Sequence, residues 1–243
     1  GIYSEIARPL NNDGEINITA GDSNIGLRSG NTAVLINKKD INISSTGKEN
    51  IGLYTSTGTV ENDDTTGNVT ITAGENIGIM SAGTGTANNK GTITVTADGS
   101  TGAIATGGTV NNTGTISVTG NTSSNGRGAA GIIASGGTFT ATGSGTVTAN
   151  VTGKNSVGIY AKNGTATVLQ NNTDTADGAV NYAVDTNGTI NLNGTGTANT
   201  GASALLFYND GGKINVNSPL TANISGGSNT PATWGTAFLY TGS

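Results

Sequence analysis

Carboxylates are the side chains of this sequence most able to carry out chemistry. The chain has 243 residues with 15 Asp and Glu, no His and no Cys, which excludes a thiol nucleophile, an imidazole base and the commonest metal ligands. Carboxylate pairs remain, as enzymes that cleave polysaccharides use them. Nine of the acids lie within residues 1–64, and none lies between Asp98 and Asp174. We therefore predict no enzymatic activity, no catalytic residues and no cofactor.

Two local sequences have the composition of an ion site. Residues 61–64 read Glu-Asn-Asp-Asp, the densest acidic group, which could supply oxygen ligands to a hard cation. A solvated turn explains the same residues, and we predict no metal site. The stretch Gly126-Arg127-Gly128 superficially resembles a phosphate loop, but it lacks the Gly-Lys-Ser/Thr ending and a following helix.

The overall composition indicates a structured chain that is not a nucleic-acid binder. Gly, Thr and Asn (41, 42 and 32 residues) make up close to half of the sequence, and charged residues only 10 %. A disordered chain usually has a high net charge, whereas the net charge here is −5. The isoelectric point near 4.5 argues against a nucleic-acid partner, because phosphate binding requires an excess of Lys and Arg.

A short marker recurs along the chain: an apolar residue, then Gly or Ala, then another apolar residue. Its central residues lie at positions 1, 26, 52, 78, 102, 131, 158, 183, 204 and 237. The intervals average about 26 residues, a period typical of repeat architectures. Short stretches such as Ile41–Ser44 and Ile93–Thr96 precede the markers and alternate apolar with polar residues, as half-buried strands do.

Two or three short strands in each repeat predict a parallel β-helix, in which each strand pairs with its counterpart one repeat later. We expect an all-β, right-handed coil of about nine rungs without significant α-helix, a rung being one repeat, and a rod roughly 43 Å long. An antiparallel sandwich is the alternative, which the fixed period disfavours. Residues 1–243 form one unit in this interpretation, and the longest marker interval predicts a loop at about 208–236.

The ends of the chain suggest a fragment of a longer array. Gly1-Ile2-Tyr3 is itself a marker, and the last marker ends at Tyr240, three residues before the end of the sequence. Solenoids need capping repeats to cover their terminal strands, and neither end has the features of a cap. We expect further rungs on at least one side and head-to-tail contacts between copies through open edges.

Positions counted from the marker centre predict a binding stripe. Position +1 is always apolar and is expected to face the core with position −1, so that the marker Gly and position +2 face outward. Position +2 is occupied by Tyr3, Arg28, Tyr54, Met80, Ile104, Ile133, Tyr160, Asp185, Leu206 and Leu239. We assign ligand binding to Tyr3, Arg28, Tyr54, Met80 and Tyr160 in this column and to Trp234 in the long loop. The alternative is that a bend or a loop buries position +2.

The marker also carries a family resemblance. The sequence Asn-Ile-Gly-Leu/Ile occurs at residues 24–27, 50–53 and 76–79, joined by strands rich in Thr, Gly and Asn. This texture resembles the passenger domains of type V autotransporters, especially the very large autotransporter adhesins of fusobacteria. The resemblance implies a β-helical passenger that a C-terminal barrel exports to the bacterial cell surface. The absence of Cys suits that route.

The same resemblance implies a function in attachment. The expected partners are a host cell-surface protein or glycan, or the surface of another bacterium, with no nucleic acid and no direct membrane insertion of this chain. Three alternatives stay open: a carbohydrate-active β-helical enzyme, a structural stalk and an ice-binding face built from Thr-x-Thr runs. Rung lengths that vary as much as these disfavour ice binding.

Overall fold

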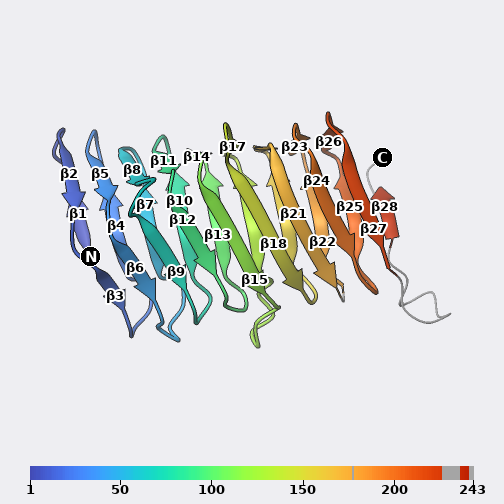
Figure 1. The fold of residues 1–243 in the computed structure, drawn as a ribbon, viewed down its shortest axis with the longest axis horizontal. Coiled ribbons are helices and arrows are strands. Elements are labelled where there is room, and N and C mark those ends of the chain that lie inside the picture. Colours follow the sequence, from blue (N-terminus) through green and yellow to red (C-terminus); the bar gives the residue numbers. More distant parts are fainter. Residues whose placement is uncertain (177, 226–235, 241–243) are drawn as a thin grey trace.

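The chain folds into a parallel β-helix of about nine rungs. A computed structural model describes residues 1–176, 178–225 and 236–240. All of its regular elements are strands, and every strand pairs in parallel with the strand one rung before or after it. The rungs follow one another along a rod, with β1 (Ile2–Ser4) at one end and β28 (Thr236–Tyr240) at the other (Figure 1). The prediction of a parallel β-helix is confirmed; its right-handedness stays a prediction.

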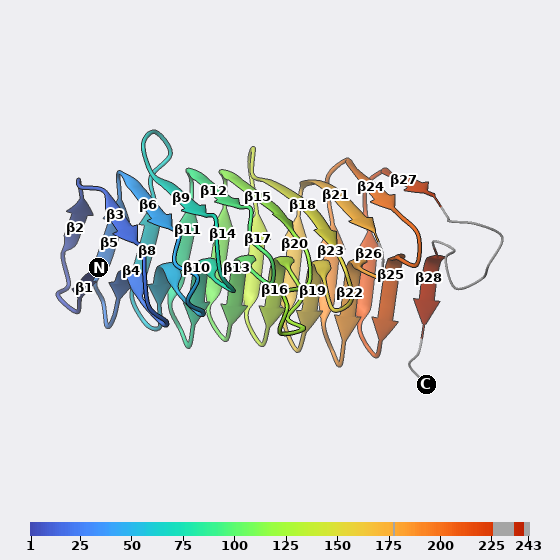
Figure 2. The same ribbon diagram turned by 90° about the horizontal axis from the view of Figure 1, so that it is seen from below.

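Three sheets run the length of the rod (Figure 2). Sheet A is ordered β1, β4 (Ile25–Ser29), β7 (Ile51–Thr55), β10 (Ile77–Ala82), β13 (Thr101–Thr106), β16 (Ala130–Ser135), β19 (Val157–Lys162), β22 (Val180–Asp185), β25 (Leu205–Asp210) and β28. Sheet B is ordered β2 (Pro9–Asn12), β5 (Val34–Asn37), β8 (Thr59–Asn62), β11 (Thr86–Asn89), β14 (Thr109–Asn112), β17 (Thr138–Ala141), β20 (Thr165–Val168), β23 (Thr189–Leu192) and β26 (Lys213–Val216). Sheet C is ordered β3 (Ile16–Ile18), β6 (Asp40–Ile43), β9 (Asn68–Ile71), β12 (Thr92–Val95), β15 (Thr115–Gly120), β18 (Thr146–Thr152), β21 (Gln170–Ala176), β24 (Gly196–Thr200) and β27 (Leu220–Ile224).

The core is a narrow column of apolar side chains, one layer per rung. Leu27, Leu53 and Ile79 occupy register-matched positions on sheet A and are fully buried. Ile41 of sheet C and Leu35 of sheet B face them from the other walls. Each rung contributes only a few such residues, which explains how a chain with so little aliphatic content retains a continuous core. No helix in the described ranges is long and apolar enough to cross a membrane.

Buried Asn side chains form a ladder at the end of the sheet B strands. Along the first five rungs, the Nδ2 atom of each Asn donates a hydrogen bond to the Oδ1 atom of the next, at 2.7–3.0 Å, through Asn12, Asn37, Asn62, Asn89 and Asn112. The ladder ends where Asn112 Nδ2 donates to the backbone carbonyl of Thr146, at 3.1 Å. These polar side chains are buried at little cost because each is paired.

The marker has a local geometry that strict alternation does not predict. A Cβ atom added to Gly52 would lie 2.5 Å from Val69 Cγ1 and 2.7 Å from the Gly78 carbonyl oxygen, so this position faces the core. Leu53 at +1 also faces the core, whereas Ile51 at −1 is half-buried. The prediction that the Gly faces outward and position −1 inward is therefore wrong. Two consecutive inward positions therefore occur in this rung, and the buried Asn181 and Leu206 occupy the Gly position in two later rungs.

Two further predictions are corrected by the strand register. Ile159 pairs with Tyr182, 23 residues later, and Tyr182 pairs with Phe207, 25 residues later. The marker centres assigned at Ala183 and Ala204 are therefore each misplaced by two residues. Position +2 is Ala183 and Tyr208 in these rungs, not Asp185 and Leu206. The long loop at 208–236 is wrong over its first half, where β26 and β27 continue sheets B and C.

Candidate binding face

The outer face of sheet A carries the predicted column. Tyr3 is 55 % exposed, Arg28 is exposed, and Tyr54, Met80 and Tyr160 are half-buried. Position −1 adds Ile25, Ile51, Val157, Val180 and Leu205, which are likewise half-buried. The face is therefore more apolar than the sequence predicts, because −1 and +2 both point outward. A binding role for these residues stays a prediction, and Trp234 lies outside the described residues.

Two hollows lie on this face, one on either side of β13. At β13 itself the outward positions are closed, since Thr101 is 1 % and Ile104 8 % exposed. The N-terminal hollow involves β4, β7 and β10, and the C-terminal hollow involves β16, β19, β22 and β25. The segment 121–129, which joins β15 to β16 and extends beyond its neighbours in Figure 1, contributes Arg127 to the N-terminal hollow.

The N-terminal hollow combines an apolar floor with cationic side chains. Its volume is about 420 Å³, and it is lined by Ser23, Ile25, Arg28, Glu49, Ile51, Tyr54, Ile77, Met80 and Arg127. The guanidinium carbon of Arg28 lies 5.1 Å from the ring centroid of Tyr3 and 5.7 Å from that of Tyr54. These three side chains come from consecutive rungs in register. The Arg is therefore held between two rings by cation–π attraction.

The C-terminal hollow is formed by two tyrosines that flank a small residue. Register places Tyr160, Ala183 and Tyr208 at the same position of successive rungs, and all three line a hollow of about 550 Å³. Tyr208 is the member that the sequence prediction missed, because the rung lacks the Gly marker. Counting from Val180 to Leu205, which are paired apolar residues, identifies it.

Asp185 is the charged centre of the C-terminal hollow. Its Oδ2 atom accepts hydrogen bonds from Lys162 Nζ at 2.8 Å and from the Tyr160 hydroxyl at 3.1 Å, and its Oδ1 atom accepts one from Thr186 at 2.7 Å. These hydrogen bonds lower the pKa of Asp185 to about 2, and the bond from Lys162 has the largest effect. Burial, followed by the bond to Asp185, raises the pKa of Tyr160 to about 12.

The Asp185 contacts predict an acid-sensitive contribution to stability. Because the folded-state pKa is below the ordinary value of about 3.9, the contribution is present at neutral pH and is lost as the pH falls from about 4 towards 2. We expect Asp185→Asn to flatten the decline of unfolding free energy in that range, measured by urea denaturation. Asp13→Asn is the matched control because it removes the same charge from an exposed position. An unchanged acid profile in Asp185→Asn would contradict the assignment.

A carboxylate pair occurs in this hollow. Asp185 and Asp210 occupy paired positions of β22 and β25, and both line the hollow. An acid/base pair requires one carboxyl group that stays protonated near neutral pH, which a raised pKa provides. The pKa of Asp185 is lowered instead. This property argues against Asp185 as a general acid.

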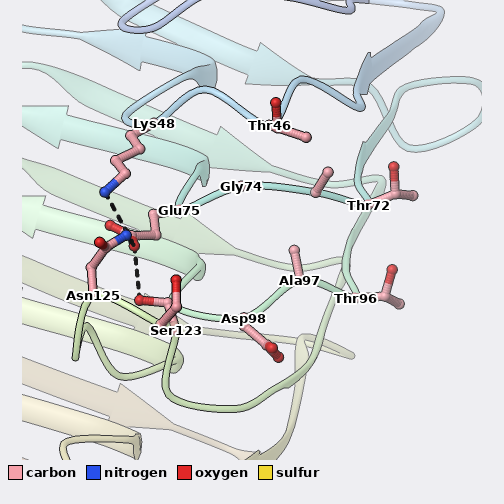
Figure 3. A pocket seen from close by; sticks show the side chains of 12 residues that line it. Thr46, Lys48, Thr72, Gly74, Glu75, Thr96, Ala97, Asp98, Ser123 and Asn125 are labelled. Atoms are coloured by element: carbon pink, nitrogen blue, oxygen red, sulfur yellow. Dashed lines mark hydrogen bonds and ion pairs between the residues drawn. The ribbon is translucent and has the colours of Figure 1, made fainter.

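A polar cleft of about 440 Å³ lies at the edge of the face, where Glu75 anchors the segment 121–129 (Figure 3). Glu75 is only 8 % exposed. Its Oε1 atom accepts hydrogen bonds from Asn125 Nδ2 at 2.7 Å and Ser123 Oγ at 2.8 Å, and Lys48 Nζ lies 3.6 Å away. The bonds from Asn125 and Ser123, with the charges of Lys48 and Arg127, lower the pKa of Glu75. The carboxylate therefore serves as an internal anchor.

Removal of the Glu75 carboxylate should release this segment. We expect Glu75→Ala to increase the rate of tryptic cleavage after Arg127 by at least about tenfold, because the two charge-assisted hydrogen bonds that tether the segment are lost. The measurement is limited proteolysis followed by mass spectrometry of the fragments. Glu61→Ala, which removes a carboxylate paired with Lys90 at 2.8 Å on another edge, is the control. Equal cleavage rates in the two variants would refute the anchoring role.

The acidic turn is accounted for by protein contacts. Glu61 pairs with Lys90, and Asp63 Oδ1 accepts hydrogen bonds from the backbone and hydroxyl of Thr65, at 3.0 and 2.7 Å, which lower its pKa. Within the described ranges, no three His, Cys, Asp or Glu side chains are grouped to hold a metal ion. Protein contacts thus hold Glu61 and Asp63 in this turn.

Comparison with known proteins adds no identity to this geometry: no family model, no curated protein and no solved structure matches the chain.

Proposed function

We propose that this chain is part of a surface-displayed adhesin of the autotransporter kind, and that the outer face of sheet A is its attachment surface. The role is non-enzymatic: the rod presents side chains to a host cell-surface protein or glycan, or to the surface of another bacterium. The cell surface is the proposed location. The Asn-Ile-Gly-Leu/Ile markers and the absence of Cys support the autotransporter assignment.

The observation that carries the proposal is that positions −1 and +2 both point outward, so that the rungs on either side of β13 present apolar side chains to this face. Positions −1 and +2 supply Ile, Val, Leu, Tyr and Met side chains to one face, with two hollows between them. Exposed apolar stripes usually mark interfaces, and Tyr and Arg contribute strongly to binding where they are present. A stalk that only spaces other domains has no need of such a face.

Binding by the purified protein tests the proposal. The chain is applied to host cells, partner bacteria and a glycan array, with the double variant Tyr54→Ser and Tyr160→Ser. We expect binding to be weaker by at least about tenfold, because each substitution removes a Tyr side chain of the kind that typically anchors an interface. Val216→Ser is the matched control, because Val216 is 48 % exposed on sheet B. Binding that the double variant leaves unchanged would place the attachment surface elsewhere.

A polysaccharide screen separates the enzyme alternative from the adhesin. Acidic and neutral polysaccharides are incubated with the chain, and new reducing or unsaturated ends are measured. Reproducible turnover that is lost in Asp210→Asn would overturn the non-enzymatic role and point to the paired carboxylates of the C-terminal hollow.

A further inference from the structure

We propose that the N-terminal hollow binds a carboxylated sugar residue, with Arg28 and Arg127 holding the carboxylate and the apolar floor holding the sugar ring. This inference rests on the proposed attachment role of sheet A and names the ligand class of one part of that face. It is drawn from the side chains that converge on this hollow.

Arg28 is fixed in place without an internal counter-charge. Its guanidinium lies over the rings of Tyr3 and Tyr54, and the three ion pairs found in the described part of the chain all use Lys. Glu5 accepts the hydrogen bond of the Tyr3 hydroxyl, and Glu49 lines the same hollow without being one of the acids in these ion pairs. A stacked guanidinium leaves its N–H edge available, and this planar edge matches a carboxylate with two parallel hydrogen bonds.

A second arginine, from far along the chain, lines the same hollow. The sequence contains only three Arg, and both Arg28 and Arg127 line this hollow. Arg127 belongs to the segment that Ser123 and Asn125 tie to Glu75. The fold therefore brings two scarce cationic side chains to one place and anchors the segment that carries one of them.

The rest of the lining suits a sugar ring. Ile51, Ile77 and Met80 give an apolar floor, and the ring of Tyr54 stands beside it. Aromatic and aliphatic surfaces of this kind complement the C–H faces of a pyranose, and the few polar groups on the rim fix its orientation. Glu49 and Ser23 occupy the rim, where their oxygens can accept hydrogen bonds from sugar hydroxyls.

The charge of the whole chain favours an isolated carboxylate over a polyanion. With a net charge of −5, the protein repels a densely sulfated glycan or a nucleic acid at long range. A single carboxylate on an otherwise neutral glycan meets little of that repulsion and is attracted by the charges of both arginines. We therefore assign the hollow to glycans that end in one carboxylated sugar.

Paired glycans test the assignment. 3′-Sialyllactose, its carboxyl methyl ester and lactose are compared by calorimetry or biolayer interferometry, together with an unsulfated hyaluronan oligosaccharide and heparin. We expect binding of 3′-sialyllactose, with the methyl ester and lactose about tenfold weaker or worse, because charge-assisted hydrogen bonds are lost. Tighter binding of the hyaluronan oligosaccharide than of 3′-sialyllactose would contradict the assignment to a single terminal carboxylate.

Variants locate the site. Arg28→Gln and Arg127→Gln should each weaken the carboxylated probe by about tenfold and leave the methyl ester unchanged. Arg8→Gln is the matched control, because it removes the same charge at an exposed turn away from the hollow. Thermal unfolding of each variant verifies the fold, and Arg127→Gln, on a connecting segment, keeps the test valid if Arg28→Gln is unstable.

The outcomes separate this inference from the proposed function. Three results would overturn the carboxylated-sugar site but not the adhesin. The first is equal affinity for the carboxylated and esterified probes, and the second is a preference for heparin. The third is that no glycan binds although the chain still attaches to cells and this attachment depends on Tyr54. No binding to cells, bacteria or glycans would overturn both.

Discussion

Replacing Gly78 by Ala is expected to lower the free energy of unfolding by about 3 kcal/mol, the upper range for overpacked cores. A Cβ atom at this position would lie 2.5 Å from Ile93 Cγ2 and 2.6 Å from the Gly102 carbonyl oxygen. The first contact is with a fully buried core side chain, and the second is with the backbone of the next rung. The Gly102 backbone cannot shift without separating rungs, and Ile93 has no free space in the core, so a single methyl group should disturb the stack.

Gly14→Ala provides the matched control. A Cβ atom at Gly14 meets nothing within 4 Å, so the same substitution should change stability by no more than about 0.5 kcal/mol. Urea denaturation of both variants measures the difference, with circular dichroism to verify retained β-structure. Equal stability of Gly78→Ala and wild type would mean that the marker Gly is not a packing requirement and that the inward geometry described here is wrong.

The architecture and the core column could be predicted from the sequence. The period of the marker and the strict apolarity of +1 identified the architecture and the core column, because Leu27, Leu53 and Ile79 recur in a pattern that only stacking satisfies. The outward direction of Tyr54 and Tyr160 followed from the same column. Periodicity is sufficient for these features because every rung repeats them.

The features that were missed depend on single rungs. Strict alternation predicts that position −1 faces the core. Because the marker Gly and position +1 both face inward, position −1 faces outward instead, and this is evident only from the close contacts around Gly52. Rungs that replace the Gly by Asn181 or Leu206 lose the marker, so Tyr208 was not recognised. The convergence of Arg28 and Arg127 depends on where the segment 121–129 lies, which no local pattern in the sequence determines.

The Asn ladder gives the second large expected effect. Asn62 is fully buried; its Nδ2 atom donates to Asn89 Oδ1 at 2.9 Å and to the Thr92 carbonyl at 3.3 Å, and its Oδ1 atom accepts from Asn37 Nδ2 at 3.0 Å. Asn62→Ala leaves the Asn37 Nδ2 donor and the Asn89 Oδ1 acceptor without this partner. Each buried group that loses its partner lowers the free energy of unfolding by about 1–3 kcal/mol. We expect a loss of about 3–5 kcal/mol, a large part of the 5–15 kcal/mol typical of a domain.

A half-buried Asn on the outer face of sheet C controls for the loss of the amide itself. Asn42 Nδ2 donates to Asn17 Oδ1 at 3.0 Å and to Glu15 Oε1 at 2.9 Å, where solvent can replace either partner. Asn42→Ala should therefore cost no more than about 0.5 kcal/mol. If urea denaturation shows that Asn42→Ala and Asn62→Ala lower the free energy of unfolding by similar amounts, burial is not the reason why the ladder stabilises the fold.

Asn62→Asp distinguishes a missing donor from a missing side chain. The carboxylate keeps the shape of the amide and can accept from Asn37, but it faces the Oδ1 atom of Asn89 with no proton to share. Burial raises the pKa of such a carboxyl group, so its protonated form, which can donate, is favoured as the pH falls. Relative to wild type, we expect Asn62→Asp to be less destabilised at pH 4 than at pH 7, whereas the deficit of Asn62→Ala stays constant. A pH-independent deficit in Asn62→Asp would mean that the ladder acts through packing alone and not through its directed hydrogen bonds.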